Sequence, residues 1–242
     1  MAATTATSIR VSPRVDPVLD ADVLVGREWM ADPAAATSWP VSEVELPWIK
    51  RVFDVLGGLA LLLLSLPVLV AAAVAIKLTD GGPVFFRQHR VGLGGQKFEI
   101  VKLRTMNTNA EALAARLVGA DCTEGLLFRV PNDPRVTRVG AFLRRSAIDE
   151  LPQLWNVLRG EMSLVGPRPL AVEVDAFAPH EHLRHAVKPG LTGAWQVSGG
   201  NNLPWDVMIA LDVDYAFGWS VARDLGIMLR TVPALVGRVG PS

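Results

Sequence analysis

The sequence of 242 residues contains only one cysteine, Cys122, and its formal net charge is zero. A single cysteine excludes an intrachain disulfide, which favours a reducing, cytoplasmic environment. The N-terminal residues lack a basic segment followed by an apolar run, so we expect no signal peptide. The sequence also lacks a Walker loop and any internal repeat. These absences argue against a secreted disulfide scaffold, a P-loop nucleotide hydrolase and a repeat array.

Two motifs resemble binding sites only superficially. His180, His182 and His185 match no common zinc spacing and have no cysteine nearby, so we expect solvated or hydrogen-bonded histidines. The glycines of Gly92-Leu93-Gly94-Gly95 lack the strand–loop–helix context of a dinucleotide fingerprint, so we expect a turn.

The zero net charge conceals an uneven distribution. Residues 1–46 hold three arginines and seven acidic residues, which gives this segment −4 and the remainder +4. A basic body beside a membrane suits anionic lipid and phosphate substrates. Ordinary charge scatter is the alternative, so this pattern carries no conclusion alone.

Composition predicts a folded body with one membrane segment. Half of the residues are hydrophobic and the mean hydropathy is +0.30, yet charged residues make up 20%. We expect a disordered tail at 1–46, a re-entrant membrane helix at 47–80, and a cytoplasmic domain at 81–242 that ends in amphipathic helices.

The apolar stretch 55–76 contains no charged residue and as a straight helix would span roughly 33 Å, enough for a bilayer core of ~30 Å. Pro67 at its middle should kink or break the helix, and the Ser65 hydroxyl could satisfy a freed backbone group. Cations flank both ends, which favours entry and exit through the cytoplasmic face. A proline-kinked single span is equally compatible with the sequence. The flanking cations are Lys50, Arg51, Lys77 and Arg87.

The remaining pattern predicts a mostly α fold with a small β-hairpin, an α+β class. The hairpin should pair 83–91 with 97–104. Helices are expected at 109–118, at 137–145 with Val139, Phe142 and Leu143 on one face, and after Asp149 with a stripe of Leu151, Leu154, Trp155 and Leu158. Residues 166–169 should form a rigid extended loop. The segment 205–239 predicts two amphipathic helices, either at the membrane interface or in the core.

The pair Asp149-Glu150 stands at a helix start, because Pro152 fits only the first turn. The helix dipole there favours an ionised carboxylate, which can act as a nucleophile and as an oxygen ligand for Mg²⁺. Simple helix capping is the common alternative. Arg144, Arg145 and Arg168 surround the pair, and arginine is suited to phosphate oxygens. A solvated basic face is the alternative for the Arg144-Arg145 pair.

Together these segments resemble the bacterial sugar transferases, the monotopic phosphoglycosyl transferase superfamily, from about Lys50 to about Val232. The matching strings, in order, are 50–54 (KRVFD), 83–92 (PVFFRQHRVG), 98–106 (FEIVKLRTM), 133–137 (DPRVT), 143–154 (LRRSAIDELPQL), 162–169 (MSLVGPRP), 184–193 (RHAVKPGLTG) and 195–199 (WQVSG).

The resemblance implies specific roles. Asp149 matches the family nucleophile, which attacks the β-phosphate of a UDP-sugar, releases UMP, and passes the sugar phosphate to a polyprenyl phosphate. Mg²⁺, with Asp149 as a ligand, would neutralise the pyrophosphate, and Glu150 would support this chemistry. The expected substrate-binding residues are Lys102, Arg104, Arg144, Arg145, Pro167, Arg168, Arg184 and Gln196.

Two departures from the family pattern occur. Leu66 separates Ser65 from Pro67 at the expected helix break, whereas some members have an adjacent Ser-Pro. Gly200 follows the WQVSG string where the family commonly has an arginine, which puts the substrate in doubt rather than the reaction class.

The resemblance implies transfer of a hexose 1-phosphate to undecaprenyl phosphate at the cytoplasmic face of a bacterial inner membrane, as the start of exopolysaccharide or capsule assembly. Expected partners are the UDP-sugar, undecaprenyl phosphate and membrane lipid, but no nucleic acid. A homo-oligomer is left open as an alternative to a single copy of the chain. One alternative is a catalytically weak homologue that senses UDP-sugars or scaffolds polysaccharide assembly. A plain lipid-binding domain is another, but it leaves the Asp-Glu pair and the Pro-Arg-Pro loop unexplained.

Overall fold

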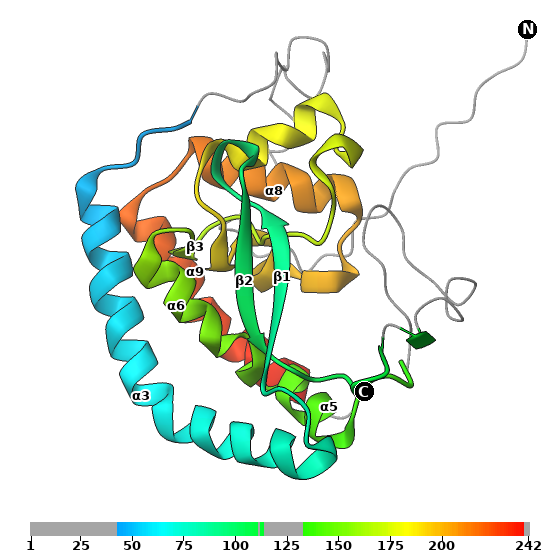
Figure 1. The fold of residues 1–242 in the computed structure, drawn as a ribbon. Coiled ribbons are helices and arrows are strands. Elements are labelled where there is room, and N and C mark those ends of the chain that lie inside the picture. The colour runs from blue at the N-terminus through cyan, green and yellow to red at the C-terminus, as the bar shows by residue number, and fades with distance from the viewer. Residues whose placement is uncertain (1–42, 111, 114–132, 240–242) are drawn as a thin grey trace, which may run out of the picture.

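The computed structural model describes residues 43–110, 112–113 and 133–239 (Figure 1). Cys122, nearly all of the expected tail and most of the expected helix 109–118 lie outside the described residues. From the described part of the tail, the Val44 backbone N–H donates to Ala186 O at 2.8 Å, and Leu46 packs against the core.

The longest element is α3, Trp48–Asp80, which contains Pro67. Figure 1 shows it running down one side of the body and then bending to continue beneath it. Pro67 removes an intrahelical donor and crowds the preceding turn, which explains the bend. The Ser65 hydroxyl donates to Leu62 O at 3.0 Å, in the turn before the proline. The expected helix–break–helix is therefore corrected to one continuous, bent helix.

The apolar part of α3 is largely uncovered. Its most apolar window has a mean hydropathy of 2.8, and only 17% of that window is buried. Length and composition would allow a membrane crossing, but core helices and signal sequences can share them, so the membrane topology stays a prediction.

The start of α3 is fixed to the body by buried charges. Lys50 Nζ lies 2.7 Å from Asp224 Oδ2 and 3.3 Å from Asp54 Oδ1. Asp54 Oδ1 in turn accepts bonds from Ser163 Oγ and the Leu164 N–H, both at 3.0 Å. The Arg51 guanidinium donates to the carbonyls of Val157 and Leu158 at 2.6 and 2.7 Å. These two cations are therefore engaged with the protein and are not free flanking charges.

The predicted hairpin is confirmed. Strands β1, Phe85–Val91, and β2, Lys97–Leu103, pair antiparallel with Gln88 opposite Ile100 and Arg90 opposite Phe98. The 3₁₀ helix η1, Leu93–Gly95, forms the turn, and its Gly94 and Gly95 adopt positive φ. The glycine motif is thus a turn, as the sequence predicts.

A second, parallel pair of three-residue strands was not predicted. Strand β3, Ser163–Val165, pairs with β4, Gly190–Thr192. A Cβ at Gly190 would lie 2.0 Å from Gly166 N, so glycine is required for this close approach. Such short strands, far apart in sequence, leave no periodic signal.

Helix α5, Arg138–Arg145, confirms the helix expected at 137–145, and Thr137 caps it by accepting a bond from the Gly140 N–H at 2.9 Å. Leu143 is buried, but Phe142 is exposed, so the predicted face is wrong at Phe142. Phe142 and Leu143 are adjacent in sequence, about 100° apart around a helix, and only one of them can face the core fully.

The helix predicted after Asp149 is two elements. The 3₁₀ helix η3, Ile148–Gln153, leads into α6, Leu154–Arg159. The tighter turns of η3 rotate the buried face away from the predicted stripe. Leu154 and Val157 are fully buried, whereas Trp155 is 54% exposed. The prediction that Trp155 belongs to the buried stripe is therefore wrong.

The C-terminal half surrounds the core with α7, Ala194–Ser198, α8, Trp205–Phe217, and α9, Val221–Val239. Helix α8 is buried continuously from Met208 to Ala216; it is a core helix, and the interfacial interpretation is wrong for it. Helix α9 is amphipathic, with an exposed apolar stripe of Val221, Leu225, Leu229 and Val232. The connecting 3₁₀ helices are η4, Val174–Ala176, η5, Pro179–Ala186, and η6, Gly200–Asn202.

Candidate active site

The Asp149-Glu150 pair lies in the first turn of η3, as expected from Pro152. The turn is entered through Ala147, whose φ of 54° is the only positive value for a non-glycine among the described residues. An alanine in this conformation costs on the order of 1 kcal/mol. The backbone is therefore strained immediately before a buried carboxylate, which is common at functional sites.

Glu150 is clamped by two cations. The Arg168 guanidinium donates to both carboxylate oxygens, with Nη1 2.8 Å from Oε2, and Lys102 Nζ lies 3.5 Å from Oε1. Burial opposes ionisation of Glu150, but the adjacent Arg168 and Lys102 outweigh it and hold the pKa of Glu150 below its ordinary value. Glu150 is thus a fixed anion that orients the Arg168 fork.

Asp149 has the opposite electrostatic setting. It is 8% exposed, and within the described chain no hydrogen bond or ion pair to its carboxylate is formed. Burial, and then the neighbouring Glu150 charge, raise the pKa of Asp149 to about 6, against the attraction of Lys102, Arg144 and Arg168. The helix dipole expected to favour an ionised carboxylate does not lower the pKa here, because a six-residue 3₁₀ helix does not offset dehydration. The group remains mostly ionised at pH 7.

Adjacent carboxylates with pKa values pushed apart are typical of sites in which two acids have different roles. Glu150 is committed to its cations, whereas Asp149 is available to react.

Arg90 is a cation of the site that the sequence analysis did not single out. Burial, and then the Arg168 charge, lower the pKa of Arg90 to about 10. It donates to Gln88 at 2.6 Å, while its Nε is buried and has no hydrogen-bond partner among the described residues. The strand pairing places Arg90 and Lys102 on the same face of the hairpin, and this alternation is the signal that could have found it.

Lys102 is similarly dehydrated, and burial foremost lowers its pKa. Together with Arg90, Arg144 and Arg168, it gives four cations around two carboxylates. The four cations outnumber the two carboxylates, and the Arg90 Nε–H has no acceptor among the described residues. Such a site suits an incoming phosphate anion.

The other predicted arginines have different positions. Arg144 Nε donates to Thr105 Oγ1 at 2.8 Å and lies close enough to Asp149 to influence its pKa. Arg145 is exposed, and no bond in the described chain brings it to the pair. Arg104 forms a bidentate salt bridge with Asp80 and donates to Pro83 O at 2.5 Å. The structure therefore does not bring Arg104 or Arg145 into the cluster.

Arg184 and Pro167 support the backbone around Arg168 and do not join its side chain in the cation cluster. The fully buried Arg184 donates twice to Asp212 Oδ2, at 2.6 and 3.1 Å, and once to Arg168 O at 2.7 Å. Pro167 O accepts a bond from the Gly190 N–H at 2.9 Å. These contacts fix the backbone from which the Arg168 fork extends.

The model of the family described as bacterial sugar transferase matches residues 46–238. The chain belongs to this family.

The sugar transferase chain has several curated relatives. It is 47% identical over 206 residues to the UDP-glucose:undecaprenyl-phosphate glucose-1-phosphate transferase of Caulobacter vibrioides, covering 81% of this chain and 73% of that protein. It is 42% identical to the exopolysaccharide production protein ExoY of Rhizobium meliloti, covering 77% and 84%. It is 39% identical to the UDP-galactose-lipid carrier transferase of Erwinia amylovora, covering 80% of this chain but only 41% of that relative.

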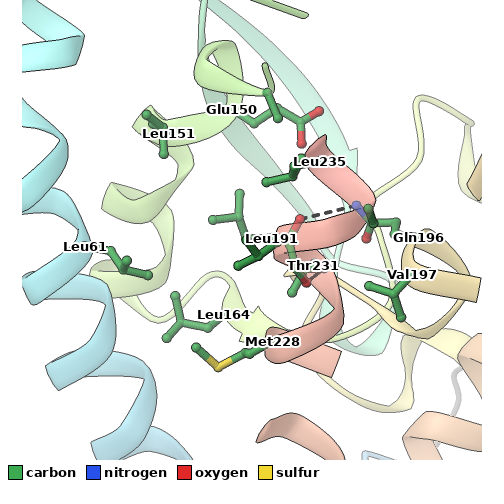
Figure 2. Close-up of a pocket in the computed structure, with 14 residues that line it drawn as sticks. Leu61, Glu150, Leu151, Leu164, Leu191, Gln196, Val197, Met228, Thr231 and Leu235 are labelled. Carbon is green, nitrogen blue, oxygen red and sulfur yellow. Dashed lines mark hydrogen bonds between the residues drawn. The ribbon is translucent and has the colours of Figure 1, made fainter. Parts of the chain in front are cut away.

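Gln196, another of the expected substrate-binding residues, lines a cavity of about 280 Å³ beside Glu150 (Figure 2). Its Nε2 donates weakly to Leu191 O at 3.4 Å, while its Oε1 is buried and unpaired within the described part of the chain. Gly200, where the resemblance implies an arginine, is buried and adopts a φ of 58°.

The histidines of the sugar transferase are not arranged as a metal centre. Burial lowers the pKa of His185 to about 2, and its ring lies 5.1 Å from that of Phe177, edge to face. Of the two settings expected for the histidines, solvated or hydrogen-bonded, the solvated one does not apply to His185, which is a buried core residue. Across residues 43–110 and 133–239, no three His, Cys, Asp or Glu side chains gather in a way that could hold a metal ion.

The pKa of Asp149 can be tested by NMR. In metal-free protein labelled with ¹³C-aspartate, the Asp149 resonance is identified by its absence from the spectrum of the Asp149→Asn variant. We expect this resonance to titrate with a midpoint near pH 6. Glu150→Gln should move this midpoint to lower pH, because it removes a neighbouring negative charge and releases two cations. A midpoint near pH 4 in the unsubstituted protein would contradict the burial argument.

Proposed function

We propose that this chain transfers a hexose 1-phosphate from a UDP-sugar to undecaprenyl phosphate, with release of UMP, through a covalent intermediate on Asp149. This step would start the assembly of an exopolysaccharide or capsule. The observation that carries the proposal is a buried Asp149 carboxylate, without a hydrogen-bond partner among the described residues, beside a Glu150 held by Arg168 and among four cations. The names of the relatives support the donor and acceptor classes.

In the first step an Asp149 oxygen attacks the β-phosphorus of the UDP-sugar. A bond forms between this oxygen and phosphorus while the bond from phosphorus to the bridging oxygen breaks, and UMP departs with that oxygen. Arg168, Lys102 and Arg90 are placed to balance the negative charge of the phosphates. The dehydrated setting of Asp149 favours attack, because the carboxylate has little hydration to lose.

In the second step an oxygen of the lipid phosphate attacks the same phosphorus, and the Asp149 carboxylate leaves. The product is a sugar linked through a diphosphate to the lipid, and the enzyme returns to its starting state. One active carboxylate thus serves as nucleophile and then as leaving group.

The donor set fits Mg²⁺ delivered with the substrate. Mg²⁺ commonly uses one or two carboxylates together with substrate phosphates and water. Of the pair, Asp149 is the carboxylate whose oxygens have no partner in the part of the chain that the structure describes. When bound, Mg²⁺ would neutralise the pyrophosphate charge. Glu150 is already held by Arg168 and Lys102, so we assign it to positioning these cations.

We further propose that the bent α3 enters and leaves the inner membrane by the cytoplasmic face. Its start is bound to Asp224, and its end to Arg104 through Asp80. Both ends are thus attached to one body, so a full crossing would require breaking one set of these contacts. The exposed apolar stripe of α9 would rest on the same membrane surface.

Cysteine labelling in intact cells tests this topology. In a Cys122→Ser background, Glu45→Cys and Thr79→Cys, at exposed positions flanking α3, should both resist a membrane-impermeant thiol reagent until the cells are opened. A periplasmic domain of the same cell with an engineered cysteine serves as the positive control. Labelling of only one of the two positions in intact cells would show a true crossing and would refute the re-entrant arrangement.

Release of UMP tests the function. Purified protein with Mg²⁺ and undecaprenyl phosphate should release UMP, and UDP-glucose or UDP-galactose should turn over faster than UDP-N-acetylglucosamine. Faster turnover of the N-acetylated donor would overturn the hexose assignment alone. No UMP from any UDP-sugar would favour the sensor or scaffold interpretation instead.

A further inference from the structure

The cavity beside Glu150 lies between segments that are distant in sequence. Figure 2 shows Leu61 of α3 on one side, Gln196 and Val197 of α7 on the other, and Met228 and Leu235 of α9 completing the wall. Leu164 and Leu191 contribute from the β3–β4 pair. The space of about 280 Å³ is thus a partly open cavity between α3, α9 and the core.

The walls of this cavity suit a hydrocarbon. Most of its lining side chains are aliphatic, and the hydroxyls of Thr192 and Thr231 are bonded to each other at 2.8 Å. Gln196, whose Oε1 is unpaired within the described chain, and Glu150 are part of the lining, but a uridine or a sugar would still leave most of its hydrogen-bonding groups unmatched. Apolar cavities of ~150 Å³ can hold benzene, so this volume accommodates a branched hydrocarbon of roughly ten carbons.

Charge is found at one end of the cavity. Glu150 lines it, and the same carboxylate is gripped by Arg168 and Lys102. In Figure 2, Glu150 lies at the opposite end of the view from Leu164 and Met228. Arg168 and Lys102 contact Glu150 but do not themselves line the cavity. A ligand whose phosphate reaches these cations would extend its hydrocarbon between α3 and α9.

We propose that this cavity holds the isoprene units next to the phosphate of the lipid acceptor. The proposal rests on the function proposed above and adds where the acceptor binds. The remainder of the long chain would leave past Leu61 along the uncovered apolar surface of α3. The cavity would thus select lipid phosphates by the hydrocarbon nearest to phosphorus and would leave the donor site unaffected.

A cavity-filling substitution tests this assignment. Ala234→Phe places a ring in the wall of the cavity, and Ala222→Phe makes the same change on α9 at an exposed position that does not line it. Binding of geranylgeranyl phosphate and of inorganic phosphate would be measured in the same detergent, together with KM for each substrate. Val197→Phe, from the opposite wall, replaces Ala234→Phe if the latter does not fold.

We expect Ala234→Phe to weaken geranylgeranyl phosphate binding and to raise the acceptor KM by at least ~10-fold, because a filled pocket excludes the chain. Inorganic phosphate binding and the donor KM should change less than twofold, and Ala222→Phe should match the unsubstituted protein. An unchanged acceptor KM in a folded Ala234→Phe protein would overturn the proposal. Equal competition by phosphatidate would also overturn it, as it would show a general lipid pocket.

The outcome is separable from the proposed function. If the unsubstituted protein releases no UMP, the function fails, whereas the binding measurement still reports on the cavity. If the unsubstituted protein releases UMP normally, and geranylgeranyl phosphate binds it and the Ala234→Phe variant with equal affinity, only the cavity assignment fails.

Discussion

Asp149→Asn is expected to abolish sugar-phosphate transfer, with kcat reduced by at least ~10³-fold. The amide has nearly the same shape as the carboxylate, but it cannot attack phosphorus to form an acyl phosphate. Release of UMP from the donor, measured with and without acceptor, should fall to the background of a protein-free reaction.

This loss should occur without unfolding. The pKa of Asp149 is raised from 3.8 to about 6 in the folded protein. A raised carboxylate pKa means that ionisation opposes folding once the pH exceeds the unfolded value, by roughly 2–3 kcal/mol above pH 6. A neutral amide removes this penalty, so Tm at pH 7.5 should stay equal or rise. Asp206→Asn, at an exposed position on α8, is the matched control and should retain activity. Near-normal turnover by Asp149→Asn would refute the nucleophile assignment.

Arg168→Lys is expected to lower kcat/KM by about 10²-fold although the charge is retained. Lysine cannot reproduce the bidentate salt bridge with Glu150, and it offers the phosphates a single flexible ammonium group. The freed Glu150 charge would also raise the pKa of Asp149 further. Arg159→Lys, an exposed arginine on α6, controls for general effects of the exchange and should change kcat/KM less than twofold. Equal losses in the two variants would contradict a specific role for the Arg168 fork.

Local patterns predicted the elements that are determined locally. The hairpin follows from two β-prone runs around a glycine turn, and α5 follows from Thr137 and its capping bond to Gly140. The bend in α3 follows from Pro67, because proline acts on its own helix. Each of these features depends on residues within a few positions of one another.

Features that depend on distant contacts were missed or misread. The β3–β4 pair requires Gly166 and Gly190 to approach closely, which no periodicity reveals. Arg90 belongs to the site because β1 pairs with β2, and Arg184 supports Arg168 only because α8 supplies Asp212. Lys50 and Arg51 resembled free flanking cations until the fold brought them to Asp224 and the end of α6.

The ionisation of Asp149 also could not be predicted from local sequence patterns. Sequence position correctly placed it at a helix start beside arginines. Its pKa, however, is governed first by burial, which depends on the packing of the whole chain. The residue could be predicted from the sequence, but the chemistry of its environment required the fold.

The mass of the intact protein after mixing with donor and Mg²⁺, in the absence of acceptor, tests the central claim most directly. The account predicts that the unsubstituted protein gains the mass of one sugar phosphate, that undecaprenyl phosphate removes this mass, and that Asp149→Asn never gains it. Transfer that proceeds without any adduct in rapidly quenched samples, or an equal adduct on Asp149→Asn, would contradict a covalent mechanism through Asp149.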